Sequence, residues 1–146
     1  MSPNRESVLI LDGQTNQALA CVRSLGRAES DVLVAATRRR PLAAWSRYCT
    51  GRFKLPGETP AAFQALRAWA IARGVTMVLP LTERSCVLCN LEREAWEAAG
   101  IAVACAPDPV LRRAFDKTAT LAAARASDVN VPPTRMPTSM SEAHAL

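Results

Sequence analysis

The chain has 146 residues, of which 49% are hydrophobic and 21% charged, the composition of an ordinary globular protein large enough for one core. No apolar run approaches the roughly 20 residues of a membrane span, and the apolar residues 8–11 are too short a stretch for a signal peptide, so we expect a cytoplasmic protein without a membrane partner. The net charge is +5, with the positive excess inside residues 1–55, and the five irregularly spaced cysteines do not indicate a disulfide framework.

The first half of the chain alternates continuous apolar runs with helical periodicity. Residues 8–11 and 32–36 are apolar throughout, as in strands that a parallel sheet buries on both faces. Between them, residues 18–25 place apolar side chains three or four positions apart, which predicts a helix. A short helix over residues 41–48 and a brief strand over residues 53–55 are predicted next.

The second half continues the same alternation. Pro60 suits the first turn of a helix that ends before Gly74. Strands are predicted over residues 77–80 and 101–105, and one amphipathic helix with apolar positions from 88 to 99 separates them. Two further helices are predicted to follow, over residues 109–115 and 117–126.

Strands that alternate with helices are typical of βαβ units and a parallel sheet. We therefore predict an α/β fold, a Rossmann-like three-layer sandwich with a mostly parallel sheet of about five strands. Residues 8–11 are expected at the sheet centre. From residue 131 onward, prolines, serines and threonines replace the periodic pattern. The domain is accordingly predicted over residues 1–130, followed by a linker over residues 131–146. The tail beyond Pro137 is expected to be weakly ordered or held by a neighbouring chain.

The turn after the first predicted strand stands where open α/β sheets bind ligands. It reads Asp12-Gly13-Gln14-Thr15-Asn16 and holds one glycine, so it does not match the G-x-G-x-x-G fingerprint of dinucleotide sites. Two interpretations stay open from the residues alone. The turn binds a ligand, because a helix N-terminus favours an anion, or it is a plain turn with Thr15 or Asn16 as the helix cap.

Motifs for metal binding and nucleophilic catalysis are weak in this sequence. Cys86 and Cys89 form a C-x-x-C, but zinc would need a second ligand pair, and the sequence has none. The single histidine, His144, stands near the C-terminus, which argues against a histidine-based catalytic triad. We therefore predict two structural cysteines that are neither bridged nor metal-bound, with no metal site and no catalytic residue in this chain.

Positive charge gathers at Arg38, Arg39 and Arg40, with more cations up to Lys54. Such a cluster can attract phosphates or nucleic acid. It can equally be a solvated, arginine-rich surface. The residues alone leave both interpretations open.

Lys117 has an unusual predicted position. Asp116 is a natural N-cap for the helix over residues 117–126. Lys117 then lies in the first turn, where a cation is unfavourable against the helix dipole unless an anion compensates it. The position hints at a contact with phosphate, although a lysine extended into water costs little.

Several short motifs follow one another along residues 8–134. They are Ser46-Arg47-Tyr48 before Leu55-Pro56, Val78-Leu79-Pro80-Leu81-Thr82-Glu83, Pro107-Asp108-Pro109-Val110-Leu111, Asp116-Lys117 and Val129-Asn130-Val131-Pro132-Pro133-Thr134. In this order and spacing, the sequence resembles the pre-ATP-grasp domain of ATP-grasp ligases, in the branch similar to the large subunit of carbamoyl phosphate synthase. Asp128 and Asn130 depart from the family's usual Gly-Val-Pro-Val-Pro, but both residue types tolerate turn conformations.

The resemblance implies the N-terminal, substrate-side domain of an ATP-dependent carboxylate–amine ligase, inactive on its own. It implies that Lys117 binds the phosphates of ATP, and that Gly13, Gln14, Thr15, Asn16 and Glu83 face a small carboxylate substrate. ATP and Mg²⁺ would serve the full-length enzyme, and neither is expected to bind this chain tightly. The main expected partner is an ATP-grasp domain that this sequence does not contain.

The sequence says less about other binding partners. A homo-oligomer is compatible with the resemblance, whereas nucleic acid is not expected to bind. The alternative function is a non-enzymatic, Rossmann-like module that binds a phosphorylated ligand or nucleic acid through its basic N-terminal third.

Overall fold

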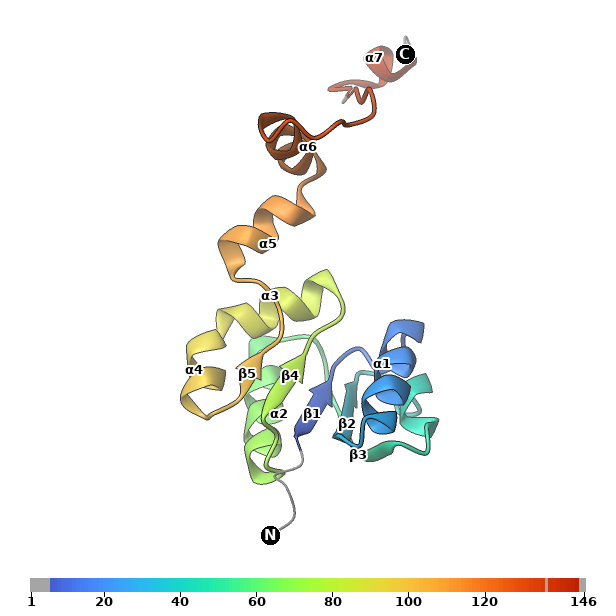
Figure 1. Ribbon diagram of the computed structural model, residues 1–146, viewed down its shortest axis with the longest axis vertical. Coiled ribbons are helices and arrows are strands. Elements are labelled where there is room, and N and C mark those ends of the chain that lie inside the picture. The colour runs from blue at the N-terminus through green and yellow to red at the C-terminus, as the bar shows by residue number, and fades with distance from the viewer. Residues whose placement is uncertain (1–5, 136, 145–146) are drawn as a thin grey trace. The chain divides into compact units, whose positions relative to one another are not determined.

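The computed structural model describes residues 6–135 and 137–144. In these residues, five strands form one parallel sheet in the order β3-β2-β1-β4-β5 (Figure 1). The strands are β1 (Ser7–Ile10), β2 (Asp31–Ala36), β3 (Cys49–Lys54), β4 (Met77–Leu79) and β5 (Ala102–Val103). The predicted parallel sheet, with its first strand at the centre, is confirmed.

Helices cover both faces of the sheet, which makes three layers (Figure 1). α1 (Asn16–Arg27) and the 3-10 helix η1 (Leu42–Trp45) pack on one face. The other face carries α2 (Pro60–Ala72), α3 (Glu83–Leu91) and α4 (Arg93–Ala98). The predicted three-layer α/β sandwich is therefore confirmed.

The two layers follow from the alternation of side chains along β1. Val8 and Ile10 belong to the buried cluster on the α1 side. Leu9 and Leu11 belong to the cluster on the α2 side, which also contains Trp96. A strand without a solvent-facing side needs apolar residues at every position. On each face, burial stabilises the fold by about 25 cal/mol per Å² of apolar surface removed from water. This explains the continuous apolar run at residues 8–11.

The chain divides into two compact units, Met1–Asp108 and Pro109–Leu146. The sheet and the helices on its two faces belong to the first unit. In the described part of the chain, no helix combines the length and apolar character that crossing a bilayer requires.

The region after the sheet contains three helices among the described residues: α5 (Asp108–Phe115), α6 (Lys117–Ala126) and α7 (Met140–His144). None of the residues in these helices is buried. Asp116 caps α6 as predicted, because its Oδ1 accepts hydrogen bonds from two backbone N–H groups, at 2.8 and 3.1 Å. α7 lies inside the segment 131–146 that was predicted as a linker, and the boundary at residue 130 stays a prediction.

The single amphipathic helix predicted with apolar positions from 88 to 99 is wrong in one respect. The helix begins at Glu83 and is interrupted at Glu92, whose φ of −120° is not helical. The Glu92 carboxylate forms an ion pair with Arg67 of α2 at this break. Periodicity within one segment cannot show a contact with another helix, so the sequence predicted one helix instead of α3 and α4.

β3 and η1 also differ from the predicted elements. β3 begins at Cys49 and not at residue 53, because its residues pair with β2 from Cys49 onward. Half-buried and exposed residues alternate along β3, as in an edge strand, so no continuous apolar run marks it. The helix expected over residues 41–48 is limited to the single 3-10 turn of η1.

Candidate functional site

The loops after β1 and β4 meet at the carboxyl edge of the sheet. β1 pairs with β2 on one side and with β4 on the other. The helices that follow these loops pack on opposite faces, since α1 follows β1 and α3 follows β4. Open α/β sheets bind ligands at such a switch point, outside the carboxyl ends of the strands. The predicted substrate residues after β1 and β4 therefore share one neighbourhood.

Asp12 joins the two loops through a single carboxylate oxygen. Its Oδ2 accepts hydrogen bonds from the backbone N–H groups of Leu81 and Thr82, both at 3.0 Å, and from the Ser85 hydroxyl at 2.7 Å. Asp12 is 6% exposed and has a left-handed φ of 56°, which aspartate tolerates better than most residues. This carboxylate fixes the loop after β1 to the first turn of α3.

Thr82 and Ser85 complete the junction as a capping box. The Thr82 hydroxyl accepts a hydrogen bond from the Ser85 N–H at 3.2 Å, and the Ser85 hydroxyl accepts one from the Thr82 N–H at 3.1 Å. The roles of Asp12 and Ser85 are not among the sequence-based predictions. An aspartate directly after a buried strand, combined with Thr-x-x-Ser before a helix, is the signal that points to them.

Gly13 is required where the loop crosses the end of β2. A Cβ atom at this position would lie 2.3 Å from Val34 Cγ1 and 3.3 Å from the Ala35 carbonyl oxygen. The Gly13 N–H donates to that same carbonyl at 3.0 Å, and its own carbonyl accepts from the Ala43 N–H at 2.9 Å. Gly13 is buried, so this close approach explains the glycine without a ligand.

Thr15 is the N-cap of α1, and its hydroxyl accepts a hydrogen bond from the Ala18 N–H at 3.1 Å. This outcome confirms the cap interpretation for Thr15. Asn16 is the exposed first residue of α1. Gln14 is half-buried, and its Oε1 atom is shielded from solvent without a hydrogen-bond donor in the described part of the chain. Among the predicted residues of this loop, Asn16 therefore presents an exposed polar group to a ligand, whereas the Gln14 Oε1 atom is buried.

Glu83 is the first residue of α3, immediately after the Thr82 cap. Its side chain is exposed, and no described residue forms a hydrogen bond or ion pair with its carboxylate. A carboxylate in the first turn is stabilised by the helix dipole. The structure thus places an unpaired negative charge next to the loop that Asp12 holds.

Lys117, the predicted phosphate contact, belongs to the second unit. It is the exposed first residue of α6, directly after the Asp116 cap. The predicted location in a first helical turn is confirmed. Its role toward ATP stays a prediction.

The fold matches several solved structures, although no family model and no curated protein matches the chain. The biotin carboxylase domain of a single-chain bacterial carboxylase matches 96% of the chain with 23% identity and a TM-score of 0.62. L-amino acid ligase from Bacillus licheniformis matches 90% of it with 16% identity and a TM-score of 0.62. The biotin carboxylase subunit of pyruvate carboxylase matches 97% with 17% identity and a TM-score of 0.60.

The chain has the fold of an ATP-grasp N-terminal domain. This confirms, at the level of the fold, the resemblance that the sequence motifs indicated. The match covers 33%, 32% and 32% of the lengths of these three structures. The chain therefore spans about a third of each of them, and the further assignment to the branch similar to carbamoyl phosphate synthase stays a prediction.

The five cysteines of this ATP-grasp N-terminal fold are free thiols. Burial raises the pKa of Cys89, and burial together with the neighbouring Cys105 thiol raises the pKa of Cys86 to about 11. Both thiols are therefore protonated near neutral pH and are poor nucleophiles. Within the described residues, no three His, Cys, Asp or Glu side chains are grouped closely enough to hold a metal ion.

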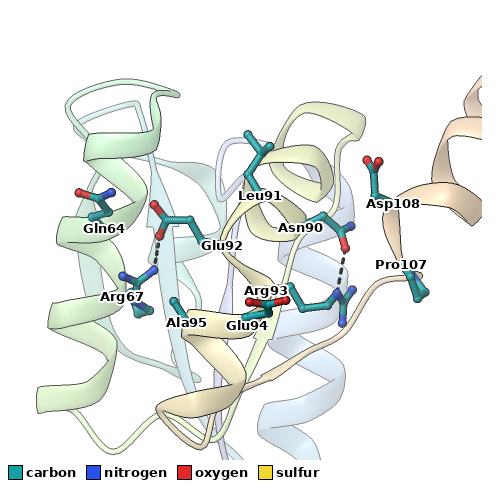
Figure 2. Close-up of a pocket in the computed structure, with 10 residues that line it drawn as sticks. All are labelled: Gln64, Arg67, Asn90, Leu91, Glu92, Arg93, Glu94, Ala95, Pro107 and Asp108. Atoms are coloured by element: carbon teal, nitrogen blue, oxygen red, sulfur yellow. Dashed lines mark hydrogen bonds and ion pairs between the residues drawn. The ribbon is translucent and has the colours of Figure 1, made fainter.

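A polar hollow of about 610 Å³ lies elsewhere on the same unit, between α2 and the junction of α3 with α4 (Figure 2). Its charged side chains are largely satisfied inside the protein. Arg67 pairs with Glu92, and Arg93 donates to Asn90 Oδ1 at 2.8 Å (Figure 2). Arg93 also donates to the Cys105 carbonyl at 2.6 Å. None of the predicted substrate or ATP residues lines this hollow.

Proposed function

We propose that the chain is the substrate-side domain of an ATP-dependent carboxylate–amine ligase, in which a further domain carries the ATP-grasp machinery. The fold of the chain supports this proposal. The observation that carries it is the Asp12 junction, which brings the loop of Gln14 and the N-terminus of α3 with Glu83 to one edge of the sheet.

The proposed site combines the two kinds of polar group that such a substrate needs. An amine nucleophile is protonated at neutral pH, and it can donate to the exposed Glu83 carboxylate, which lacks a protein partner among the described residues. The N-termini of α1 and α3 carry partial positive charge at the same edge, which favours a substrate carboxylate. These groups bind and orient the substrate.

The residues of this chain do not by themselves fit Mg-ATP. Lys117 offers one cation for a phosphate, and the described residues provide no group of carboxylates that could hold Mg²⁺. When bound in the complete enzyme, ATP would supply the phosphoryl group that activates the substrate carboxylate. The adenine slot and the metal ligands belong, in this proposal, to the further domain.

The gene provides the first test. The DNA after the codon for Leu146 should continue in frame and encode a lysine-bearing strand and an acidic pair for Mg²⁺. A stop codon directly after Leu146 would favour the alternative, a free-standing binding module.

The encoded full-length protein provides the second test. ADP release is measured with Mg-ATP and a pooled set of amino acids, which supplies both carboxylates and amines. Glu83→Gln should raise the KM for the amine at least about tenfold, because a charge-assisted hydrogen bond is lost. Glu94→Gln is the matched control, since Glu94 also lies exposed in the first turn of a helix. An unchanged KM in Glu83→Gln, or an equal change in both variants, would contradict the proposed site.

A further inference from the structure

A basic pocket lies at the carboxyl ends of β2 and β3. Its volume is about 380 Å³, and the residues that line it are Arg38, Arg39, Arg40, Pro41, Arg52, Phe53 and Lys54. Five of these seven residues carry a positive charge, and the described lining includes no carboxylate. We call this feature the arginine pocket.

The backbone around the arginine pocket is held firmly by the sheet. Ala36 and Lys54 are partners in the parallel ladder of β2 and β3, and the Leu55 N–H donates to the Ala36 carbonyl at 2.9 Å. Arg52 and Lys54 are two residues apart on the edge strand, so their side chains leave the same face. Phe53 between them leaves the other face and packs against the Trp69 ring, with 5.4 Å between the ring centroids.

The loop from β2 to η1 is anchored at its far end. Pro41 is buried, and the Ala43 N–H donates to the Gly13 carbonyl at 2.9 Å. The three consecutive arginines therefore project from a short loop with both ends fixed. Such a frame limits the movement of the backbone that carries the arginines, which reduces the entropy lost on binding.

The cations of the arginine pocket have no ion-pair partner among the described residues. Across the described residues, no hydrogen bond or ion pair engages the side chains of Arg38, Arg39, Arg40, Arg52 or Lys54. Other arginines of the same unit do have partners: Arg47 with Tyr48, Arg67 with Glu92, Arg84 with the Glu58 carbonyl and Arg93 with Glu97. Mutual repulsion in the pocket is relieved when an anion binds between these cations.

We propose that the arginine pocket binds the phosphate group of a phosphorylated small molecule. Guanidinium groups match phosphate oxygens with paired hydrogen bonds, and unpaired arginines can donate all of theirs. The volume falls at the small end of the range for small-molecule sites, about 300–1,000 Å³. The pocket also opens at the carboxyl edge of the sheet, where α/β folds bind ligands. This inference stands independently of the proposed ligase function.

The size of the pocket favours a small ligand over nucleic acid. A nucleic-acid surface needs basic residues along an extended track that follows successive phosphates. Here the five cations converge on one pocket at the ends of two adjacent strands. A single phosphate group can accept hydrogen bonds from several of these cations at once.

The test is a titration of the ¹⁵N-labelled chain at constant ionic strength, with chloride as the balancing anion. Inorganic phosphate and glycerol 3-phosphate are the two probes. Both should shift the backbone amides of residues 38–40 and 52–54 and the arginine Nε–H signals, with saturation in the millimolar range or below, about 4 kcal/mol of binding free energy or more. Glycerol 3-phosphate should displace inorganic phosphate from the same site.

Two double variants distinguish phosphate binding at the arginine pocket from nonspecific attraction by the net positive charge of the chain. Arg39→Gln with Lys54→Gln should raise the dissociation constant about tenfold or more, because two charged donors are lost. Arg23→Gln with Arg27→Gln removes the same charge from the exposed face of α1 and should change it less than about twofold. All four side chains are exposed, so both variants should keep the wild-type amide spectrum away from the substitutions.

Three results would overturn the proposal. The first is a linear, non-saturating response to both phosphate probes. The second is an equal increase of the dissociation constant for phosphate in the two double variants, or failure of glycerol 3-phosphate to displace inorganic phosphate. The third is tighter binding of a single-stranded oligonucleotide than of either probe, with equal loss in both double variants, which would indicate an extended nucleic-acid surface.

Discussion

At the scale of single residues, the position of the candidate site depends on Asp12. One buried oxygen satisfies two backbone N–H groups and a hydroxyl that would otherwise lack partners. Asp12→Ala should lower the free energy of unfolding by about 3 kcal/mol, because buried donors lose a charged acceptor. Asp12→Asn keeps one carbonyl oxygen and tolerates the left-handed φ, so it should cost about half as much. Urea unfolding measures both, and equal losses in the two variants would contradict this account.

Cys86 shows how burial controls reactivity at one residue. Its pKa of about 11 lies above the ordinary thiol value, so the folded state holds the proton more tightly than the unfolded state does. The associated stability is fully present below the unfolded pKa and is lost as the pH rises from about 9 through 11. Burial thus protects the thiol across the physiological range.

The measurement is alkylation of Cys86 by iodoacetamide, followed by mass spectrometry as a function of pH. At pH 8 the thiolate fraction is about one part in a thousand, so the rate should be at least about 100-fold below that of a small thiol and should rise until pH 11. The same chain in urea serves as the control and should react like an ordinary cysteine. A plateau near pH 9 in the folded protein would disprove the assignment.

At the scale of elements, the buried strands β1 and β2 were predicted more reliably than the edge strand β3 or the helix ends. β1 and β2 are buried on both faces, so consecutive apolar residues in the sequence indicate them. The start of α3 depends on the Thr82–Ser85 box, and its end depends on Glu92 reaching Arg67 in another helix. The resemblance indicated Glu83 and the loop after β1, but the Asp12–Ser85 hydrogen bond joins residues 73 apart, so neither segment by itself could show the contact.

The packing of the loop after β1 against β2 gives a prediction for Gly13. Gly13→Ala should lower the free energy of unfolding by about 2 kcal/mol, because the new methyl group would overlap Val34 Cγ1 and crowd the Ala35 carbonyl. Gly57→Ala is the control, since its Cβ would have no atom within 4 Å. Thermal unfolding compares the two variants. A Gly13→Ala protein as stable as Gly57→Ala would show that β2 gives way easily.

At the scale of the whole molecule, we predict that this chain alone does not hydrolyse ATP and binds Mg-ATP no tighter than about 1 mM, about 4 kcal/mol of binding free energy. Lys117 is a single exposed cation, and such a charge contributes at most about 1 kcal/mol. Lys117→Ala should therefore change little. Isothermal titration measures the affinity, and a micromolar value that Lys117→Ala abolishes would make the chain a nucleotide-binding module in its own right.

The central position of β1 in the sheet has a consequence for how the chain folds while it is being synthesised. Its partner β2 follows soon after, but its other partner β4 (Met77–Leu79) is made only after α2. The nascent chain can therefore cover Val8 and Ile10 with α1 early. Leu9 and Leu11 must wait for α2, α3 and α4. During translation the unfinished domain exposes one apolar face, and this is the interval in which aggregation or chaperone binding competes with folding.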